Sequence, residues 1–287
     1  MHTKPYIVSG DIYLLLSKWV IRKNLVLPEQ KFFEDLRKEF CSYMSNLFSN
    51  FEFISEKVIV EHMKTTILNS GLPCISLDPV YHSCNFLLEL TRTVNTDGSD
   101  KGLYHRFGNL PILKQLSCLK SQGFTKVCLV DDVIFSGLLV ERVIKLLSRI
   151  GIEASVICAG VGIQEGLKKV SGFNREIYCA RIYKEVVDEV CERDFYLGVP
   201  YSGRSLVSNQ NIGLPYILPY GKPDKWASIP PKSQKQFSEF CIQQTIYLFE
   251  EIEKISGRII CCSEIERKAP GQPNTGRYVN FLKSIKV

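Results

Sequence analysis

Apolar residues recur at three- and four-residue spacing through the first seventy residues, which is the period of helices with one buried face. The pattern predicts helices at 11–22, 28–48 and 55–69. The third begins after Ser55, an N-cap residue, and stops before Gly71. We interpret this block as a helical cover on a sheet that later residues form.

Short apolar runs alternate with amphipathic runs from Pro73 onward. The short runs predict strands at 74–77, 86–92, 127–130, 154–159 and 177–182. The amphipathic runs predict helices at 111–122, 139–150 and 164–169. Strands that alternate with helices favour a parallel sheet wound by crossover connections. The predicted fold class is therefore α/β, with a Rossmann-like core.

The last third of the chain is less regular. Residues 214–231 are rich in proline and aromatic residues, which excludes a regular helix there. A long helix is predicted over 232–255. We therefore predict three consecutive parts, which are a helical cover at 1–72, an α/β core at 73–205 and a C-terminal extension packed on the core at 206–287.

One segment combines several features of an anion site. Residues 126–141 read KVCLVDDVIFSGLLVE, in which an apolar run leads into Asp131 and Asp132, and Ser136 and Gly137 form a turn before the next helix. Such a turn places backbone N–H groups at a helix N-terminus, where they bind a phosphate. The neighbouring carboxylates suit a sugar diol or a metal ion. The alternative is an ordinary strand end whose two acids cap the helix.

This segment resembles the phosphoribosyl-diphosphate (PRPP) binding motif of the type I phosphoribosyltransferases. The resemblance implies a phosphoribosyltransferase-like core, in which Asp131 and Asp132 hold the ribose hydroxyls and help to place Mg²⁺. It also implies a loop that binds the 5-phosphate, formed by Phe135, Ser136, Gly137, Leu138 and Leu139.

Two parts of the segment depart from the family motif. Phe135 stands where purine-salvage members have an acid that helps to move a proton on the base, although orotate and uracil members lack that acid too. This departure argues against a purine mechanism. Leu138 and Leu139 stand where Thr, Gly or Lys usually completes the phosphate cradle. Backbone donors remain, so we expect phosphate binding to be weakened but not abolished.

The loop after strand 74–77 falls where the family binds pyrophosphate through backbone N–H groups. Its residues differ from that role, because Asp78 would repel pyrophosphate, Pro79 has no N–H, and His82 alone can become cationic. Asp78 is explained equally well as a residue that organises Mg²⁺ and as a cap or turn residue.

The family also carries a mobile lid over the reacting phosphates. Residues 103–111 fall at that position, where Arg106 would supply positive charge. Arg92, at the end of a predicted strand, is a second candidate for an anion contact. A surface loop with a structural arginine explains the same residues.

A base-recognising hood surrounds the last core strand in this family. Residues 193–204 read RDFYLGVPYSGR, which predicts a strand that opens into a turn. By position, Phe195, Tyr201 and Arg204 would frame the acceptor. An edge strand followed by a turn is the alternative.

Composition is that of an ordinary soluble protein, with 45% hydrophobic and 23% charged residues among 287. A net charge of +6 tolerates anionic ligands but indicates no dedicated nucleic-acid surface. No apolar stretch reaches membrane-spanning length. The eleven cysteines are scattered, without a C-x-x-C pair and without histidines at ligand spacing. We therefore expect unpaired thiols and a cytoplasmic location.

These features lead to two hypotheses from different classes. The first is a Mg²⁺- and PRPP-dependent phosphoribosyltransferase that releases pyrophosphate. The second is a protein of the same fold that senses PRPP or a nucleotide without catalysis, as a regulator or defence effector. Hydrolysis, with water as the acceptor, is a third and weaker hypothesis. The sequence leaves the acceptor and a homo-oligomer or protein partner open.

Overall fold

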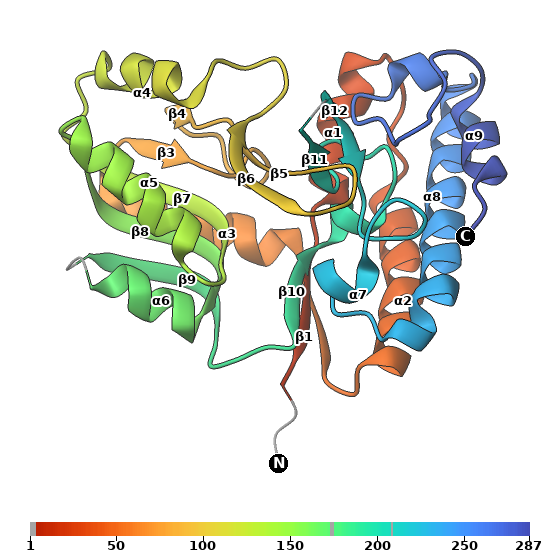
Figure 1. Cartoon of the computed structure of the whole chain (residues 1–287), viewed down its shortest axis with the longest axis horizontal. Coiled ribbons are helices and arrows are strands. Elements are labelled where there is room, and N and C mark those ends of the chain that lie inside the picture. The colour runs from red at the N-terminus through yellow and green to blue at the C-terminus, as the bar shows by residue number, and fades with distance from the viewer. Residues whose placement is uncertain (1–3, 173–174, 208) are drawn as a thin grey trace. The chain divides into compact units, whose positions relative to one another are not determined.

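The acid pair lies on the central strand of a five-stranded parallel sheet in the computed structural model (Figure 1). The structure describes residues 4–172, 175–207 and 209–287. The strand order is β4-β3-β7-β8-β9, and every neighbouring pair is parallel. The strands are β3 (Cys74–Ser76), β4 (Phe86–Leu87), β7 (Lys126–Ile134), β8 (Glu153–Ile163) and β9 (Glu176–Tyr183). The predicted α/β class with a parallel sheet is confirmed.

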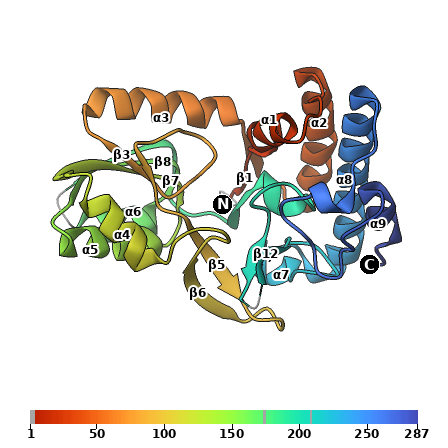
Figure 2. The ribbon, with the colours of Figure 1, turned by 90° about the horizontal axis from the view of Figure 1, so that it is seen from above.

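Helices cover both faces of this sheet. Figure 2 shows α3 (Glu56–Ser70) along one face and α4 (Ile112–Lys120), α5 (Leu138–Arg149) and α6 (Gln164–Ser171) along the other. On α5, the buried residues are Val140, Val143, Ile144 and Leu147, which repeat at helical spacing. Because β7 and β8 are covered on both sides, their apolar runs are nearly continuous rather than alternating.

The chain folds into two units, each built from separate segments. The first unit comprises Met1–Phe53, Arg92–Gly102 and Val187–Val287. The second unit comprises Ile54–Thr91 and Leu103–Val186, and it contains the five-stranded sheet. These bounds differ from the three consecutive parts predicted at 1–72, 73–205 and 206–287, because the first two helices and the C-terminal residues share one unit.

The first unit contains most of two further sheets. In one, β1 (Tyr6–Ser9) lies between β2 (Phe51–Ile54) and β10 (Asp188–Cys191), and β1 and β10 are parallel. The other has the order β12-β11-β5-β6, with β5 (Leu90–Val94), β6 (Asp100–His105), β11 (Arg204–Leu206) and β12 (Asn209–Leu214). The chain passes between the two units within β2, β5 and β6, and again between Val186 and Val187.

Helices α1 (Ile12–Arg22) and α2 (Gln30–Leu47) pack against the long helix α8 (Gln234–Ser256). Tyr43 stacks on Phe240 with ring centroids 4.3 Å apart, and Trp19 meets Phe249 edge-on at 5.8 Å. The remaining helical elements are α7 (Pro223–Trp226), α9 (Tyr278–Ser284), η1 (Glu192–Phe195), η2 (Pro231–Ser233) and η3 (Cys262–Glu264).

The structure corrects several predictions about local elements. The three N-terminal helices and the helix over 232–255 form as predicted. Of the N-terminal helices, α3 belongs to the second unit and packs on its five-stranded sheet, whereas α1 and α2 belong to the first unit and pack against α8. The strand predicted over 86–92 is divided between β4 and β5, which belong to different sheets. The strand predicted within 193–204 is also wrong, because η1 and turns precede β11 there.

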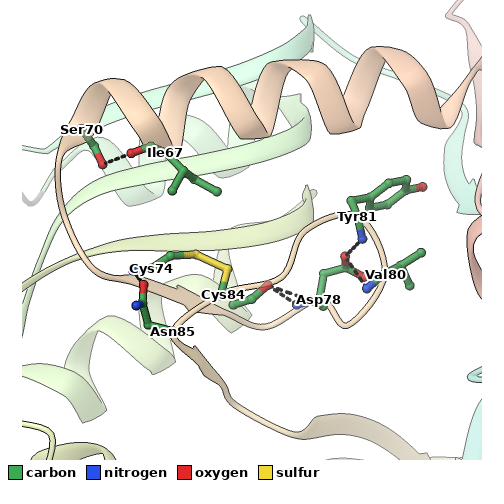
Figure 3. The surroundings of a disulfide bond; sticks show 9 residues. Ile67, Ser70, Cys74, Asp78, Val80, Tyr81, Cys84 and Asn85 are labelled. Carbon is green, nitrogen blue, oxygen red and sulfur yellow. Dashed lines mark hydrogen bonds between the residues drawn. A yellow bond between two sulfur atoms is a disulfide. The ribbon is translucent and has the colours of Figure 1, made fainter. Parts of the chain in front are cut away.

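A disulfide joins Cys74 at the start of β3 to Cys84 in the loop before β4 (Figure 3). The prediction of unpaired thiols is therefore wrong for this pair. The spacing of ten residues gave no signal, because only the return of the chain toward β4, which lies beside β3, brings the two sulfurs together. The other described cysteines form no disulfide.

No helix in the described ranges is long and apolar enough to cross a membrane.

Candidate functional site

Strands β3 and β7 lie side by side, and the sheet extends from them in opposite directions. β3 pairs with β4 on one flank, whereas β7 pairs with β8 on the other. Open parallel sheets bind ligands beyond the carboxyl ends of their strands at such a switch point. The loops after β3 and β7, both in the second unit, therefore frame the candidate site.

Asp131 is the more buried acid of the pair, with 5% of its surface exposed. Its Oδ1 accepts a hydrogen bond from the N–H of Asp132 at 3.0 Å. Burial raises the pKa of Asp131 well above the ordinary value, and the negative charges of Asp132 and Asp78 raise it further. A cation or a pair of hydroxyl donors at this point would stabilise the ionised form of Asp131.

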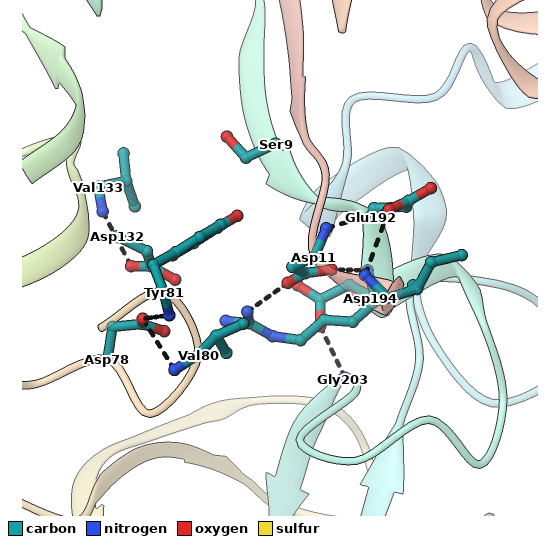
Figure 4. Close-up of polar contacts among 12 residues, drawn as sticks. Ser9, Asp11, Asp78, Val80, Tyr81, Asp132, Val133, Glu192, Asp194 and Gly203 are labelled. Atoms are coloured by element: carbon teal, nitrogen blue, oxygen red, sulfur yellow. Dashed lines mark hydrogen bonds and ion pairs between the residues drawn. The ribbon is translucent and has the colours of Figure 1, made fainter. Parts of the chain in front are cut away.

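Asp132 is half-buried, and its Oδ1 accepts the N–H of Val133 at 2.9 Å (Figure 4). β7 continues through both acids to Ile134, four residues beyond the predicted end of the strand at 130. The acids thus lie within the last part of the strand. Their backbone is held by β8, since Asp131 is in register with Ala159 and Val133 with Val161.

The candidate phosphate loop, residues 135–139, leads directly from β7 into α5. Gly137 is the N-cap of α5 and has a φ of 73°, a left-handed conformation that favours glycine. The N-cap residue is a glycine and gives this helix no side-chain cap. The first helical hydrogen bond runs from the N–H of Glu141 to the carbonyl of Gly137. The N–H groups of the first turn therefore have no acceptor within the helix and carry its positive dipole end. Phe135 and Leu138 are exposed on this loop, and Ser136 is half-buried.

The loop after β3 uses its backbone donors internally. The Oδ2 of Asp78 accepts the N–H groups of Val80 at 2.9 Å and Tyr81 at 2.8 Å (Figure 4). The N–H of Asp78 donates in turn to Ser76 Oγ. Asp78 is 3% exposed and holds the turn as an acceptor, which agrees with its interpretation as a turn residue. The N–H groups of Val80 and Tyr81 therefore already have an acceptor within the loop.

His82 lies in this loop, and Arg106 reaches the strand that precedes it. Burial lowers the pKa of His82, and the nearby charge of Lys64 lowers it further, so the imidazole is less easily protonated. Arg106 reaches the carboxyl end of β3, where its Nη2 lies 3.4 Å from the carbonyl oxygen of Leu77, but its Nε pairs with Glu89 at 3.2 Å. Arg106 is therefore held in place by an acid that sequence reasoning missed, although a glutamate inside the apolar run FLLEL was the available signal.

The other predicted site residues belong to the first unit. Phe195 is fully buried and packs edge-on against Phe237, with ring centroids 5.2 Å apart, so it is a core residue that no ligand can reach. The Arg204 guanidinium stacks over Trp226 at 4.7 Å. Tyr201 is 38% exposed with a φ of 65°. Arg92 is exposed on β5.

The donor set suits Mg²⁺ only in combination with a phosphorylated ligand. The described residues contain no group of three or more His, Cys, Asp or Glu side chains arranged to hold a metal ion. Mg²⁺ is commonly bound through one or two carboxylates together with substrate phosphates, rather than in an all-protein cage. Asp131 and Asp132 fit that mode, because the repulsion between their charges would be relieved by a divalent cation.

Neither a scan against family models nor a search of curated proteins gives a match to this chain. Among solved structures, orotate phosphoribosyltransferase from Aeropyrum pernix is similar to 44% of this chain and 68% of its own length, with a TM-score of 0.25 and 12% sequence identity. A TM-score of 0.25 is too low to support a functional assignment. The function proposed below is therefore based on the sheet and its loops.

Proposed function

We propose that the second unit binds the 5-phosphoribosyl group of PRPP or of a nucleoside monophosphate, and that it transfers this group from PRPP to a nitrogenous acceptor. The observation that supports this proposal is the order of features along one strand and helix. A buried acid pair on β7 is followed by an uncapped helix N-terminus, so hydroxyl acceptors and anion donors lie a few residues apart.

In the proposed reaction, a nitrogen lone pair of the acceptor forms a bond to ribose C1 while the bond from C1 to the pyrophosphate oxygen breaks. The electron pair of that bond leaves with pyrophosphate, through a transition state with oxocarbenium character, and the acceptor nitrogen loses its proton to water or to pyrophosphate. Asp131 and Asp132 would orient the sugar by accepting hydrogen bonds from its hydroxyls, and the first turn of α5 would bind the 5-phosphate. Mg²⁺, when bound with the substrate, would neutralise charge on the leaving group.

A second candidate function is ligand sensing without transfer. It is favoured by the loop after β3, where the Asp78 carboxylate occupies two N–H groups that would otherwise stabilise pyrophosphate. A site of this kind would bind ribose 5-phosphate or a nucleoside monophosphate through Asp132 and the α5 N-terminus, with no leaving group to stabilise. The chain would then act as a nucleotide-responsive regulator or effector.

Calorimetry on the full chain tests the shared part of both candidates. The ligands are PRPP, ribose 5-phosphate and nucleoside monophosphates, each with and without Mg²⁺. We expect ribose 5-phosphate to bind, and Asp132→Asn to weaken it by about tenfold or more, the loss of one charge-assisted contact. Glu153→Gln is the matched control, because Glu153 lies at the amino end of β8 and is exposed. Absence of binding by every ligand would contradict both candidates.

Pyrophosphate release then separates the candidates. Incubation of the full chain with PRPP, Mg²⁺ and a panel of nitrogenous bases should release pyrophosphate if transfer occurs. PRPP binding without pyrophosphate release for any base supports the sensing function instead. Release of free ribose 5-phosphate without an acceptor would indicate hydrolysis.

A further inference from the structure

We propose that Gly166, in the first turn of α6, is a positioning residue for the candidate phosphate loop at 135–139. This role rests on the proposed function for the identity of the ligand, whereas the contact that underlies it is a property of the free protein. Gly166 lies about thirty residues after the loop in the sequence, and no part of the motif at 126–141 points to it.

The sheet brings α6 to the loop. β8 ends at Ile163 and α6 begins at Gln164, so no connecting residues separate the strand from the helix. β7 and β8 are parallel neighbours, with Ile134 in register with Gly162. The residues that follow the two strands therefore emerge at the same edge of the sheet, and the first turn of α6 meets the loop that follows Ile134.

The contact between them is made by backbone on both sides. A Cβ added at Gly166 would lie 2.3 Å from the carbonyl oxygen of Phe135 and 2.9 Å from the nitrogen of Gly137. Conversely, a Cβ added at Gly137 would lie 2.7 Å from the carbonyl oxygen of Gly166. These separations are shorter than a carbon atom tolerates, and backbone atoms cannot swing aside as a flexible side chain does. Any larger residue at Gly166 must displace the loop or the helix.

The segment formed by β8 and α6 also lies close to the backbone of the acid pair. A Cβ at Gly160 on β8 would lie 2.8 Å from the carbonyl oxygen of Asp132. Glycines at 160 and 166 thus allow the β8–α6 segment to approach the backbone at both ends of the stretch from Asp132 to Gly137. Glycine inside a strand is a signal of such close approach.

The position of α6 matters because the loop has no side-chain cap of its own. The backbone conformation at Gly137 and the packing of α6 against the loop both orient its N–H groups. Hydrogen bonds from N–H groups to a phosphate weaken steeply when distance or angle departs from the optimum. A small displacement of the loop by α6 would therefore weaken anion binding while leaving the sheet intact.

Two variants test the contact in opposite ways. Gly166→Ala adds an atom between α6 and the loop, whereas Val170→Ala removes Val170 Cγ2, which would lie 3.2 Å from a Cβ added at Gly137. Gly172→Ala, just past the end of α6, is the matched control, because among the described residues a Cβ there has only Lys169 O within 4 Å, at 3.8 Å. The measurement is amide hydrogen exchange on the full chain without ligand. We expect amides 135–139 to exchange about tenfold faster in Gly166→Ala, and also faster in Val170→Ala, with amides 127–130 unchanged.

Ribose 5-phosphate binding then tests the functional consequence. We expect Gly166→Ala to weaken it about tenfold and Gly172→Ala to change it less than about twofold. The inference is overturned if exchange at 135–139 in both Gly166→Ala and Val170→Ala matches the Gly172→Ala control. It is also overturned if Gly166→Ala binds ribose 5-phosphate as the wild type does. If Gly166→Ala does not fold, Val170→Ala decides both measurements. Failure of the wild type to bind contradicts the proposed function alone, because the exchange measurement needs no ligand.

Discussion

The carboxyl group of Asp78, in the loop after β3, raises the pKa of Asp131 on the neighbouring strand β7. Both residues are buried, with 3% and 5% of their surfaces exposed, so water screens their repulsion poorly. Asp132 adds a third acid to the same region. The ligand-free site is therefore electrostatically unfavourable, which is a condition that a cation or hydroxyl donors would relieve.

Burial, together with this repulsion, raises the pKa of Asp131, which predicts that Asp131→Asn alters the pH dependence of stability. An acid whose pKa is raised by folding keeps its proton in the folded state while the unfolded state loses it. The free energy of unfolding then falls as pH rises above the unfolded pKa of about 4, by at most about 1.4 kcal/mol per pH unit. Asn removes that loss, and its amide oxygen can still accept the N–H of Asp132.

Urea denaturation at pH 5 and pH 8 measures this effect. The wild type should lose more stability between the two pH values than Asp131→Asn does. Glu153→Gln, at an exposed position on the same sheet, should follow the wild type. Equal pH dependence in the wild type and Asp131→Asn would show that Asp131 is not held protonated by folding.

Substitutions at Asp78 separate the two candidate functions. Asp78→Ala removes a negative charge and releases the N–H groups of Val80 and Tyr81, so we expect PRPP to bind about tenfold more tightly relative to ribose 5-phosphate. Asp78→Asn removes the charge but retains an acceptor for the same donors, and its effect should be smaller. Calorimetry with PRPP and with ribose 5-phosphate gives the ratio of the two affinities for each variant. An unchanged ratio in both variants would mean that this loop does not contact the pyrophosphate.

Local sequence patterns predicted the helices and strands whose signals lie within one short stretch of the chain. The strand with Asp131 and Asp132, and helix α3 with Gly71 at its C-cap, follow from patterns within about fifteen residues. β1 was missed because its partner β10 is far along the chain, with Tyr6 in register with Asp188. No pattern near Tyr6 reports that pairing.

The sequence predicts the part of the site that one local motif encodes. The order of acids, turn and helix at 131–139 could be identified from the sequence, because the chemistry is carried by consecutive residues. The pairing of Arg106 with Glu89 and the approach of Gly166 to Phe135 could not, because each depends on how distant segments meet at the edge of the sheet. The burial of Phe195 against Phe237 likewise follows from tertiary packing.

The disulfide predicts a redox dependence of stability. It closes a loop with a sequence separation of 10, and the chain-entropy relation for such a loop gives about 3 kcal/mol. Reduction by a dithiol should lower the free energy of unfolding by about that amount. The double variant Cys74→Ala/Cys84→Ala should be insensitive to the reductant. Titration of free thiols in the unfolded protein confirms the bond, and a stability unaffected by reduction would contradict its contribution.

In the first unit, we expect Glu192→Gln to destabilise the fold strongly, although it changes almost no side-chain volume. The Glu192 carboxylate is fully buried and accepts two hydrogen bonds from Arg37, at 2.9 and 2.8 Å. It also accepts the N–H group of Ile12 and that of Asp11, at the start of α1 (Figure 4). Glu192→Gln places an amide NH₂ against these donors and removes the charge that balances Arg37. We expect a loss of about 3–5 kcal/mol in the free energy of unfolding.

The exposed pair of Arg22 and Glu266 provides the comparison for this prediction. Glu266 also accepts two hydrogen bonds from an arginine, at 3.2 and 2.7 Å, but the two side chains are 49% and 32% exposed. Solvent screens that pair, so Glu266→Gln should cost less than about 1 kcal/mol. Urea denaturation of both variants gives the two values. If they are equal, burial does not amplify the Glu192 interaction, and α1 does not depend on the Glu192 carboxylate as its N-terminal acceptor.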